Sequence, residues 1–287
     1  MRETFFSIAF SGLAFAMVLY IISVGLSITM GLLGVANLAH GAFAAAGGYT
    51  AYYVTNRMGV PFFPALLLAS VFIAAVSVVL ERLLYARVYA AGELEQVLLS
   101  MGLIFMTVAT LHFFFGPHSY TVEPPAALRG QIDIAGRILP TYRVFLIALG
   151  LITFVGLGFI IERTNLGACI RAAVDNRAMA EAIGVNTRRL FTIVFALGSG
   201  LAALGGAAGA EVIELSPGYA LNYLVYFLIV VAVGGLGTVT GPFFAALLLG
   251  VSDSACKILV PEFGAFFIYV AVFVVLLLRP AGLFGRS

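Results

Sequence analysis

The sequence predicts an all-α membrane protein, a polytopic bundle of about nine transmembrane helices that forms one domain over residues 1–287. Two observations lead to this fold class. Hydrophobic residues make up 62% of the chain and charged residues only 10%, and the mean hydropathy of +1.12 lies far above that of soluble domains. The few charged residues also leave long uncharged stretches, and a helix needs about 20 residues to cross a bilayer.

These uncharged stretches define the predicted spans in order. No charged residue lies between Glu3 and Arg57, a stretch long enough for two helices. Single spans are predicted over residues 58–80, 96–122, 144–161 and 190–210, two shorter spans over 215–252, and the last span over 263–278. The total is about nine, within a range of about eight to ten.

The second half of the first stretch has an unusual pattern. Glycines recur at positions 31, 34 and 41 between Leu26 and Gly41, as expected of a broken or re-entrant helix that lines a cavity. Asn37 and His40 lie in this segment, and polar side chains at membrane depth are costly. A spacing of three places both on one face if the segment is helical. Asn37, His40 and Gly41 are therefore candidates for a substrate pathway; alternatively, the two polar side chains hydrogen-bond a neighbouring helix and hold the broken segment.

Residues 162–190 form a charged insert between two spans. The insert contains five arginines, Arg163, Arg171, Arg177, Arg188 and Arg189. Its pattern predicts two short helices joined near Asp175 and Asn176, with Asp175 as the N-cap of the second helix and Gly184 at its end. Because cytoplasmic loops are enriched in Lys and Arg, we place the insert inside. It is either a helical elbow on which a soluble motor pushes or an ordinary loop held inside by its arginines.

The orientation follows from the insert. With nine spans, the N-terminus lies outside and the C-terminus in the cytoplasm. The inner segments then carry nine of the 15 Lys and Arg residues and the outer segments carry six. The longest external loop covers residues 116–140 and either connects two spans or meets a soluble partner.

The remaining titratable residues do not form a catalytic pattern. Asp253 is either an acceptor in the bundle interior or the partner of Lys257 in an ion pair at i,i+4. The sequence contains no nucleophile elbow, two-histidine zinc motif, intramembrane pair of carboxylates or phosphate-binding loop. We therefore predict no catalytic residue and no metal site. The net charge of +2 is too small to indicate a nucleic-acid partner.

Three blocks of sequence occur in order along nearly the whole chain. They are Asn37-Leu38-Ala39-His40-Gly41; an insert block from Gly167 through Arg171, Ala172, Asp175 and Ala178 to Gly184-Val185-Asn186; and Gly234-Gly235-Leu236-Gly237 to Gly241 with Arg279-Pro280-Ala281-Gly282-Leu283-Phe284-Gly285. Together they resemble the permease subunits of branched-chain amino acid ABC importers, a family that also includes urea and short-amide importers. The Asn-x-x-His-Gly form resembles one of the two permease types that pair in these systems, which implies a heterodimer.

The resemblance implies a role for the insert as a coupling helix that docks on a cytoplasmic ABC ATPase. The ATPase-coupling residues would be two glycines that shape the elbow and four charged residues that contact the ATPase: Gly167, Gly184, Arg171, Asp175, Arg177 and Glu181. ATP would be hydrolysed on that separate subunit, so the chain itself is not expected to be an enzyme or to hold a cofactor. The other implied partners are a second related permease, a periplasmic or extracellular substrate-binding protein and the lipid of a bacterial inner membrane.

The implied substrate is a branched-chain or other hydrophobic amino acid. A permease of the same family for urea or short amides is the alternative within this class. A different class is an ATP-independent secondary transporter that uses His40 or Asp253 as an ion site. An intramembrane enzyme is a third class, and the missing nucleophile and metal motifs argue against it.

Overall fold

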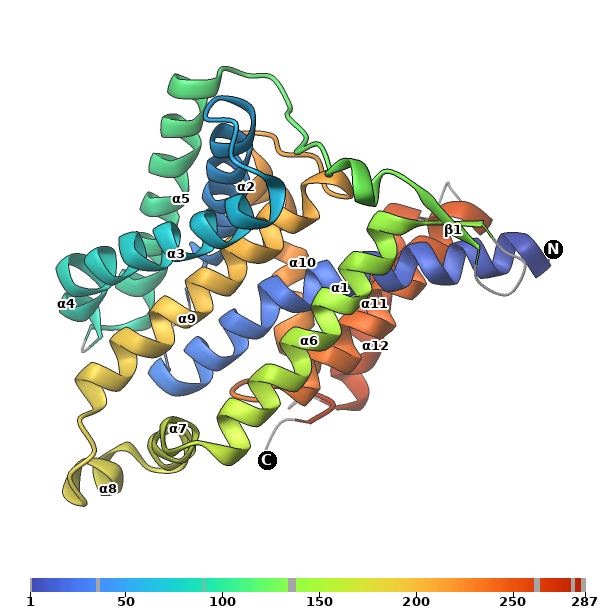
Figure 1. The fold of residues 1–287 in the computed structure, drawn as a ribbon. Coiled ribbons are helices and arrows are strands. Elements are labelled where there is room, and N and C mark those ends of the chain that lie inside the picture. Colours follow the sequence, from blue (N-terminus) through green and yellow to red (C-terminus); the bar gives the residue numbers. More distant parts are fainter. Residues whose placement is uncertain are drawn as a thin grey trace.

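A computed structural model describes residues 2–34, 37–89, 91–133, 138–260, 264–279 and 282–284. These residues form a helical bundle with one small β-hairpin (Figure 1), so the all-α prediction is confirmed. The long helices are α1 (Arg2–Leu33), α2 (His40–Asn56), α3 (Phe62–Leu80), α5 (Glu93–Phe115), α6 (Thr141–Arg163), α9 (Thr187–Ala208), α10 (Tyr219–Gly234), α11 (Thr240–Leu259) and α12 (Gly264–Leu278).

Each predicted span overlaps in sequence with one of these helices. Within the described residues, α1, α3, α5, α6, α9 and α11 are long and apolar enough to cross a membrane, whereas α2, α10 and α12 are shorter, so the total of nine stays a prediction. Three boundaries were wrong. α11 ends at Leu259, past residue 252. α5 ends at Phe115, before residue 122, because Gly116 takes a φ of +77°. The helix that begins with α3 continues past residue 80 to Val88, because a charged residue marks the edge of the membrane and does not end a helix.

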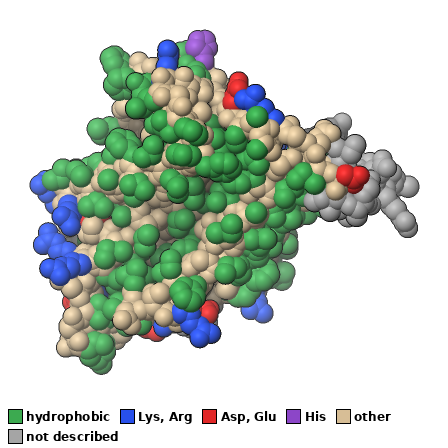
Figure 2. All heavy atoms as spheres, viewed as in Figure 1, with side chains coloured by type: hydrophobic (Ala, Val, Ile, Leu, Met, Phe, Trp, Pro, Cys, Tyr) green, Lys and Arg blue, Asp and Glu red, His purple; other side chains and the backbone are tan. Residues whose placement is uncertain are grey.

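Burial separates central helices from peripheral ones. In the apolar windows of α1 and α9, 89% and 72% of the residues are buried, against 28% or less in α3, α5 and α6. Small residues allow close packing in the centre. A Cβ added at Gly206 of α9 would lie 2.0 Å from the carbonyl oxygen of Ala44 in α2. The peripheral helices present apolar side chains outward (Figure 2), as expected for a surface in contact with lipid.

The chain breaks between α1 and α2 as the glycine pattern indicated. α1 ends at Leu33, and Gly34 takes a φ of +63°. α2 begins at His40, whose Nε2 lies 2.9 Å from the carbonyl oxygen of Ile22. Ile22 is ten residues before Leu32, the end of the apolar span of α1, or about 15 Å along the helix. α2 therefore starts well inside the bundle.

The bundle has two different ends. The loop over 116–140 contains a short 3₁₀ turn (Ala126–Leu128) and a hairpin of β1 (Gln131–Asp133) and β2 (Ile138–Pro140). The insert forms α7 (Asn165–Asp175) and α8 (Arg177–Ala182) at the opposite end, away from the start of α1 (Figure 1). Some residues used in the sequence argument lie outside the described part: Arg137, Pro280, Ala281, Gly285 and Arg286.

Candidate functional site

Side-chain caps define the helices of the insert. Thr164 Oγ1 accepts a hydrogen bond from the Gly167 N–H before α7, and Asn176 Oδ1 accepts one from the Met179 N–H before α8. Asn186 Oδ1 does the same for the Arg189 N–H before α9. Such caps satisfy N–H groups that lack a partner within the helix. The prediction that Asp175 caps α8 was wrong, because Asp175 is the last residue of α7 and Asn176 has the extended backbone that a cap requires.

The start of α7 packs on the end of α6. A Cβ at Gly167 would lie 2.1 Å from the carbonyl oxygen of Ile161, so only glycine fits there. The Arg171 guanidinium donates a hydrogen bond to the same carbonyl group. The last carbonyl groups of a helix lack partners within the helix and attract cations. Gly167 and Arg171 thus hold the insert against α6, a structural role in addition to the predicted contact with a partner.

Gly184 ends α8 as predicted. Its φ is +94°, and a Cβ at this position would meet no atom within 4 Å. The Gly184 N–H donates to the Glu181 carbonyl group and the Val185 N–H donates to the Ala180 carbonyl group, both at 3.0 Å. This is the Schellman pattern of a helix end, which favours glycine because of its positive φ. The conformation of one residue therefore sets the turn from α8 to α9.

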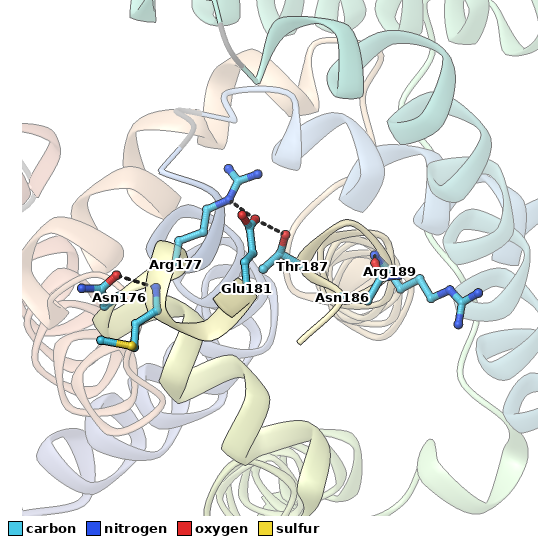
Figure 3. A network of polar contacts seen from close by, with 7 residues as sticks. Asn176, Arg177, Glu181, Asn186, Thr187 and Arg189 are labelled. Atoms are coloured by element: carbon cyan, nitrogen blue, oxygen red, sulfur yellow. Dashed lines mark hydrogen bonds and ion pairs between the residues drawn. The ribbon is translucent and has the colours of Figure 1, made fainter. Parts of the chain in front are cut away.

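Charged side chains connect α8 to the first turn of α9 (Figure 3). Arg177 Nε lies 3.0 Å from Glu181 Oε1, and the Thr187 hydroxyl donates to the same oxygen at 2.6 Å. The hydrogen bonds from Thr187 and Arg177 lower the pKa of Glu181. The Arg177 guanidinium also stacks over the ring of Phe191 in α9, 4.7 Å from its centroid. α8 and α9 are thereby linked at an exposed corner.

Sequence reasoning missed two apolar side chains of the insert. Met179 is 62% exposed and Ile183 is 71% exposed, and they lie four residues apart on the short helix α8 and at its end. On a charged segment predicted to lie outside the membrane, two neighbouring exposed apolar side chains are candidates for contact with another protein. The signal in the sequence was this i,i+4 pair inside a charged segment.

A cleft lies beside the insert. It has a volume of about 1230 Å³ and is bounded by α6, α7 and the turn between α10 and α11. Arg163, Arg171 and Asp175 line the cleft together with Glu162 and the apolar residues of the turn. Asp175 is exposed. The structure therefore places the four predicted charged contacts in two groups, one on the cleft and one at the corner of α8 and α9.

The residues of the predicted substrate pathway are buried inside the bundle. Asn37 precedes α2 outside any helix, so it does not share a helix face with His40. Asn37 Oδ1 accepts hydrogen bonds from the Ala39 N–H at 3.1 Å and from the Tyr85 hydroxyl at 2.8 Å. Asn37 Nδ2 and His40 Nδ1 have no hydrogen-bond partner among the described residues. These contacts agree with a fastening role, and the pathway role of Asn37, His40 and Gly41 stays a prediction.

The predicted ion pair in α11 is confirmed. Lys257 Nζ lies 2.6 Å from Asp253 Oδ2, and the Asp253 side chain is 2% exposed. A buried carboxylate is stable only when it is paired or hydrogen-bonded. Asp253 therefore has a local structural partner. Within the described residues, no group of three or more His, Cys, Asp and Glu side chains is placed to hold a metal ion.

Comparison with known proteins assigns nearly the whole chain to one protein family. The family described as branched-chain amino acid transport system / permease component matches residues 8–277. The high-affinity branched-chain amino acid transport system permease protein BraD of Pseudomonas aeruginosa is 24% identical over 290 residues, which cover 96% of this chain and 94% of BraD. The corresponding protein LivH of Escherichia coli K12 is 22% identical, with the same shares covered. No solved structure gives a significant match.

Proposed function

Because the chain belongs to the family of branched-chain amino acid transport permeases, we propose that it is the permease subunit of an ATP-driven importer. The proposed substrate is a branched-chain or other hydrophobic amino acid, as the names of the relatives BraD and LivH suggest. The chain would form half of the translocation pathway. The observation that supports this role best is the insert, a capped helical elbow with two exposed apolar side chains, Met179 and Ile183.

The insert is suited to transmit force. α7 is fastened to the end of α6 through Gly167 and Arg171, and α8 is linked to α9 through Arg177, Glu181 and Thr187. α9 is one of the two central helices of the bundle. A cytoplasmic ABC ATPase that binds α8 and closes on ATP would therefore tilt α9 and switch the bundle from outward to inward access.

The proposed partners follow from this role. ABC ATPase subunits bind the insert and hydrolyse ATP, so the permease itself needs no cofactor and performs no hydrolysis. A second, related permease completes the pathway as a heterodimer, and a periplasmic or extracellular binding protein delivers the substrate. The protein lies in a bacterial inner membrane with the N-terminus outside and the C-terminus inside; many arginines at the insert end favour this orientation.

An ATP-independent secondary transporter fits the contacts less well. Asp253 is paired with Lys257, and the Nε2 atom of His40 is held by the Ile22 carbonyl group. Both candidate ion sites thus have structural partners. Transport of urea or short amides by the same scaffold is a separate question, which competition for uptake decides.

The first experiment is purification of the tagged protein from its native membrane in mild detergent. We expect an ABC ATPase and a second permease in stoichiometric amounts, and ATP-dependent uptake of leucine after reconstitution in liposomes. An excess of unlabelled isoleucine should compete for uptake, and urea and acetamide should not. If the chain purifies alone and moves leucine without ATP, the proposal is wrong.

Two variants sharpen this test. Met179→Asp should abolish ATPase binding, because it places a charge in the proposed apolar contact while leaving the cap and the Arg177–Glu181 pair in place. Ile132→Asp is the matched control, an exposed apolar residue in the hairpin at the opposite end. Arg171→Glu should also uncouple transport without unfolding the bundle, although its hydrogen bond to the Ile161 carbonyl group makes Met179→Asp the more specific change.

A further inference from the structure

The helix that begins with α3 contains a π-turn over Glu81–Tyr85, just before the short helix α4 (Ala86–Val88). π-turns are rare and occur frequently at functional sites. Here the wider turn accommodates one extra residue, and both Glu81 and Tyr85 face the interior with 1% and 0% exposure. In the sequence, Glu81 is simply the first charged residue after the predicted span over residues 58–80. The fold gives it a specific set of partners.

Glu81 is a buried carboxylate held by two hydroxyl groups. The Tyr89 hydroxyl donates to Oε1 and the Thr192 hydroxyl donates to Oε2, each at 2.8 Å. Among the described residues no ion pair reaches Glu81. A buried carboxylate is costly unless it is hydrogen-bonded, so this carboxylate requires that α9 and the π-turn keep their relative positions.

One side of this arrangement leads to the insert. The ring of Tyr89 packs edge-to-face on Phe191 of α9, with centroids 5.6 Å apart. The Arg177 guanidinium of α8 stacks on the same Phe191 ring. Thr192, which donates to Glu81, follows Phe191 directly. A displacement of α8 therefore acts on both contacts of Glu81.

The other side leads to the interior of the bundle. The Tyr85 hydroxyl donates to Asn37 Oδ1 at 2.8 Å, and both side chains are buried. The Tyr85 ring packs on Phe195 of α9 at 4.9 Å between centroids, and Phe195 contacts Phe43 of α2 at 5.8 Å. Contacts thus run without a gap from Arg177 in the insert, through the π-turn, to the segment just before α2.

We propose that Glu81 and Tyr85 are positioning residues that transmit the movement of the insert to the Asn37–His40 segment inside the bundle. The inference rests on the proposed function of the insert as the ATPase contact. Glu81 makes the π-turn follow the first turns of α9, and Tyr85 makes the segment before α2 follow the π-turn. His40, at the start of α2, is in turn bonded to the Ile22 carbonyl group of α1, so the movement reaches the two central helices and α2.

The test uses the complete importer in liposomes and measures leucine uptake per ATP hydrolysed, because contiguous contacts alone do not establish coupling. Tyr85→Phe removes one hydroxyl group and keeps the ring on Phe195. We expect it to keep ATPase affinity and assembly of the importer, and to lower uptake per ATP by about three- to tenfold, the size expected for one buried hydrogen bond. Glu81→Gln keeps the side-chain length and should lower the same ratio. A simple structural role would lower uptake and hydrolysis together and leave the ratio unchanged.

Tyr20→Phe in α1 is the matched control. Tyr20 is also a fully buried tyrosine, and its hydroxyl has no hydrogen-bond partner among the described residues, so its loss should leave the ratio unchanged. If both Tyr85→Phe and Glu81→Gln show the wild-type ratio of uptake to ATP hydrolysis, this proposal is wrong. The proposed function of the insert still holds in that case if the wild-type chain binds the ATPase. Failure of both variants to assemble would also overturn it, because the residues would then serve bundle stability. Absence of ATPase binding by the wild-type chain would reject both this inference and the proposed function.

Discussion

Replacing Gly184 by alanine changes the backbone energy of the insert without a steric clash. A Cβ at this position would meet no atom within 4 Å, and the φ of +94° is the only obstacle. An L-residue with positive φ costs about 1–2 kcal/mol. Since about 1.4 kcal/mol corresponds to a factor of ten, the observed turn should become about five- to thirtyfold less favoured relative to alternative conformations of the segment.

This cost should appear in partner binding and not in bundle stability. The turn lies outside the central helices, so we expect an unchanged thermal midpoint and ATPase binding that is weaker by at most about thirtyfold. Gly184→Pro should act more strongly and uncouple transport, because proline fixes φ near −65° and removes the hydrogen bond from the Gly184 N–H to Glu181. Titration of the detergent-solubilised permease with the proposed ATPase partner measures the affinity.

Gly156→Ala is the control for glycine replacement. Gly156 is an exposed glycine within α6, and a Cβ there also meets nothing within 4 Å. With ordinary helical φ, alanine should be neutral or stabilising by up to about 1 kcal/mol. If Gly184→Ala binds the ATPase with wild-type affinity, or if both variants weaken it equally, the reasoning about the elbow is wrong.

Three further predictions concern packing, protonation and the ion pair. Gly206→Ala would bring a Cβ within 2.0 Å of the Ala44 carbonyl oxygen, and overpacking should destabilise the bundle by about 1–3 kcal/mol; an unchanged thermal midpoint in detergent would contradict this. Hydrogen bonds lower the pKa of Glu181, so the stabilisation they provide is complete above its unfolded pKa of about 4.3 and is lost as pH falls through the lower folded pKa. Proteolysis at the turn between α8 and α9 should therefore increase only below about pH 4, and the Glu181→Gln variant should lack this step. Lys257→Met leaves the buried Asp253 carboxylate unpaired and should cost about 1–3 kcal/mol in chemical denaturation, which adding Asp253→Asn should largely restore; no recovery would mean that the ion pair is not the cause.

Much of the fold was predictable because the thickness of the bilayer sets the length of a transmembrane helix. Uncharged stretches located all the long helices, and the break after Gly34 followed from repeated glycines. The positive φ of Gly184 and the pairing of Asp253 with Lys257 were also predictable, since both depend on residues within four or five positions of each other in the chain. Local patterns are sufficient for local contacts.

Other features depend on neighbours distant in sequence. The hydrogen bond from Thr192 to Glu81 joins residues 111 positions apart, and that from Tyr85 to Asn37 joins residues 48 apart. No local pattern indicates such pairs, and nothing around Glu81 in the sequence distinguishes a π-turn from the end of a span. The sequence prediction placed the N-cap of α8 at Asp175, whereas the structure places it at Asn176. Asp and Asn are both favoured at N-caps, so only the backbone angles show which of the two adjacent residues is the cap.

By itself, the sequence determined that this is a membrane-embedded helical bundle with a basic insert, because hydropathy and charge are sums over residues and need no coordinates. The tertiary structure alone decided which helices are central. Lipid and protein interior are equally apolar, so hydropathy cannot distinguish α1, which is mostly buried, from α6, which is mostly exposed. It also decided which polar side chains meet, and so connected the insert to the interior through Glu81 and Tyr85.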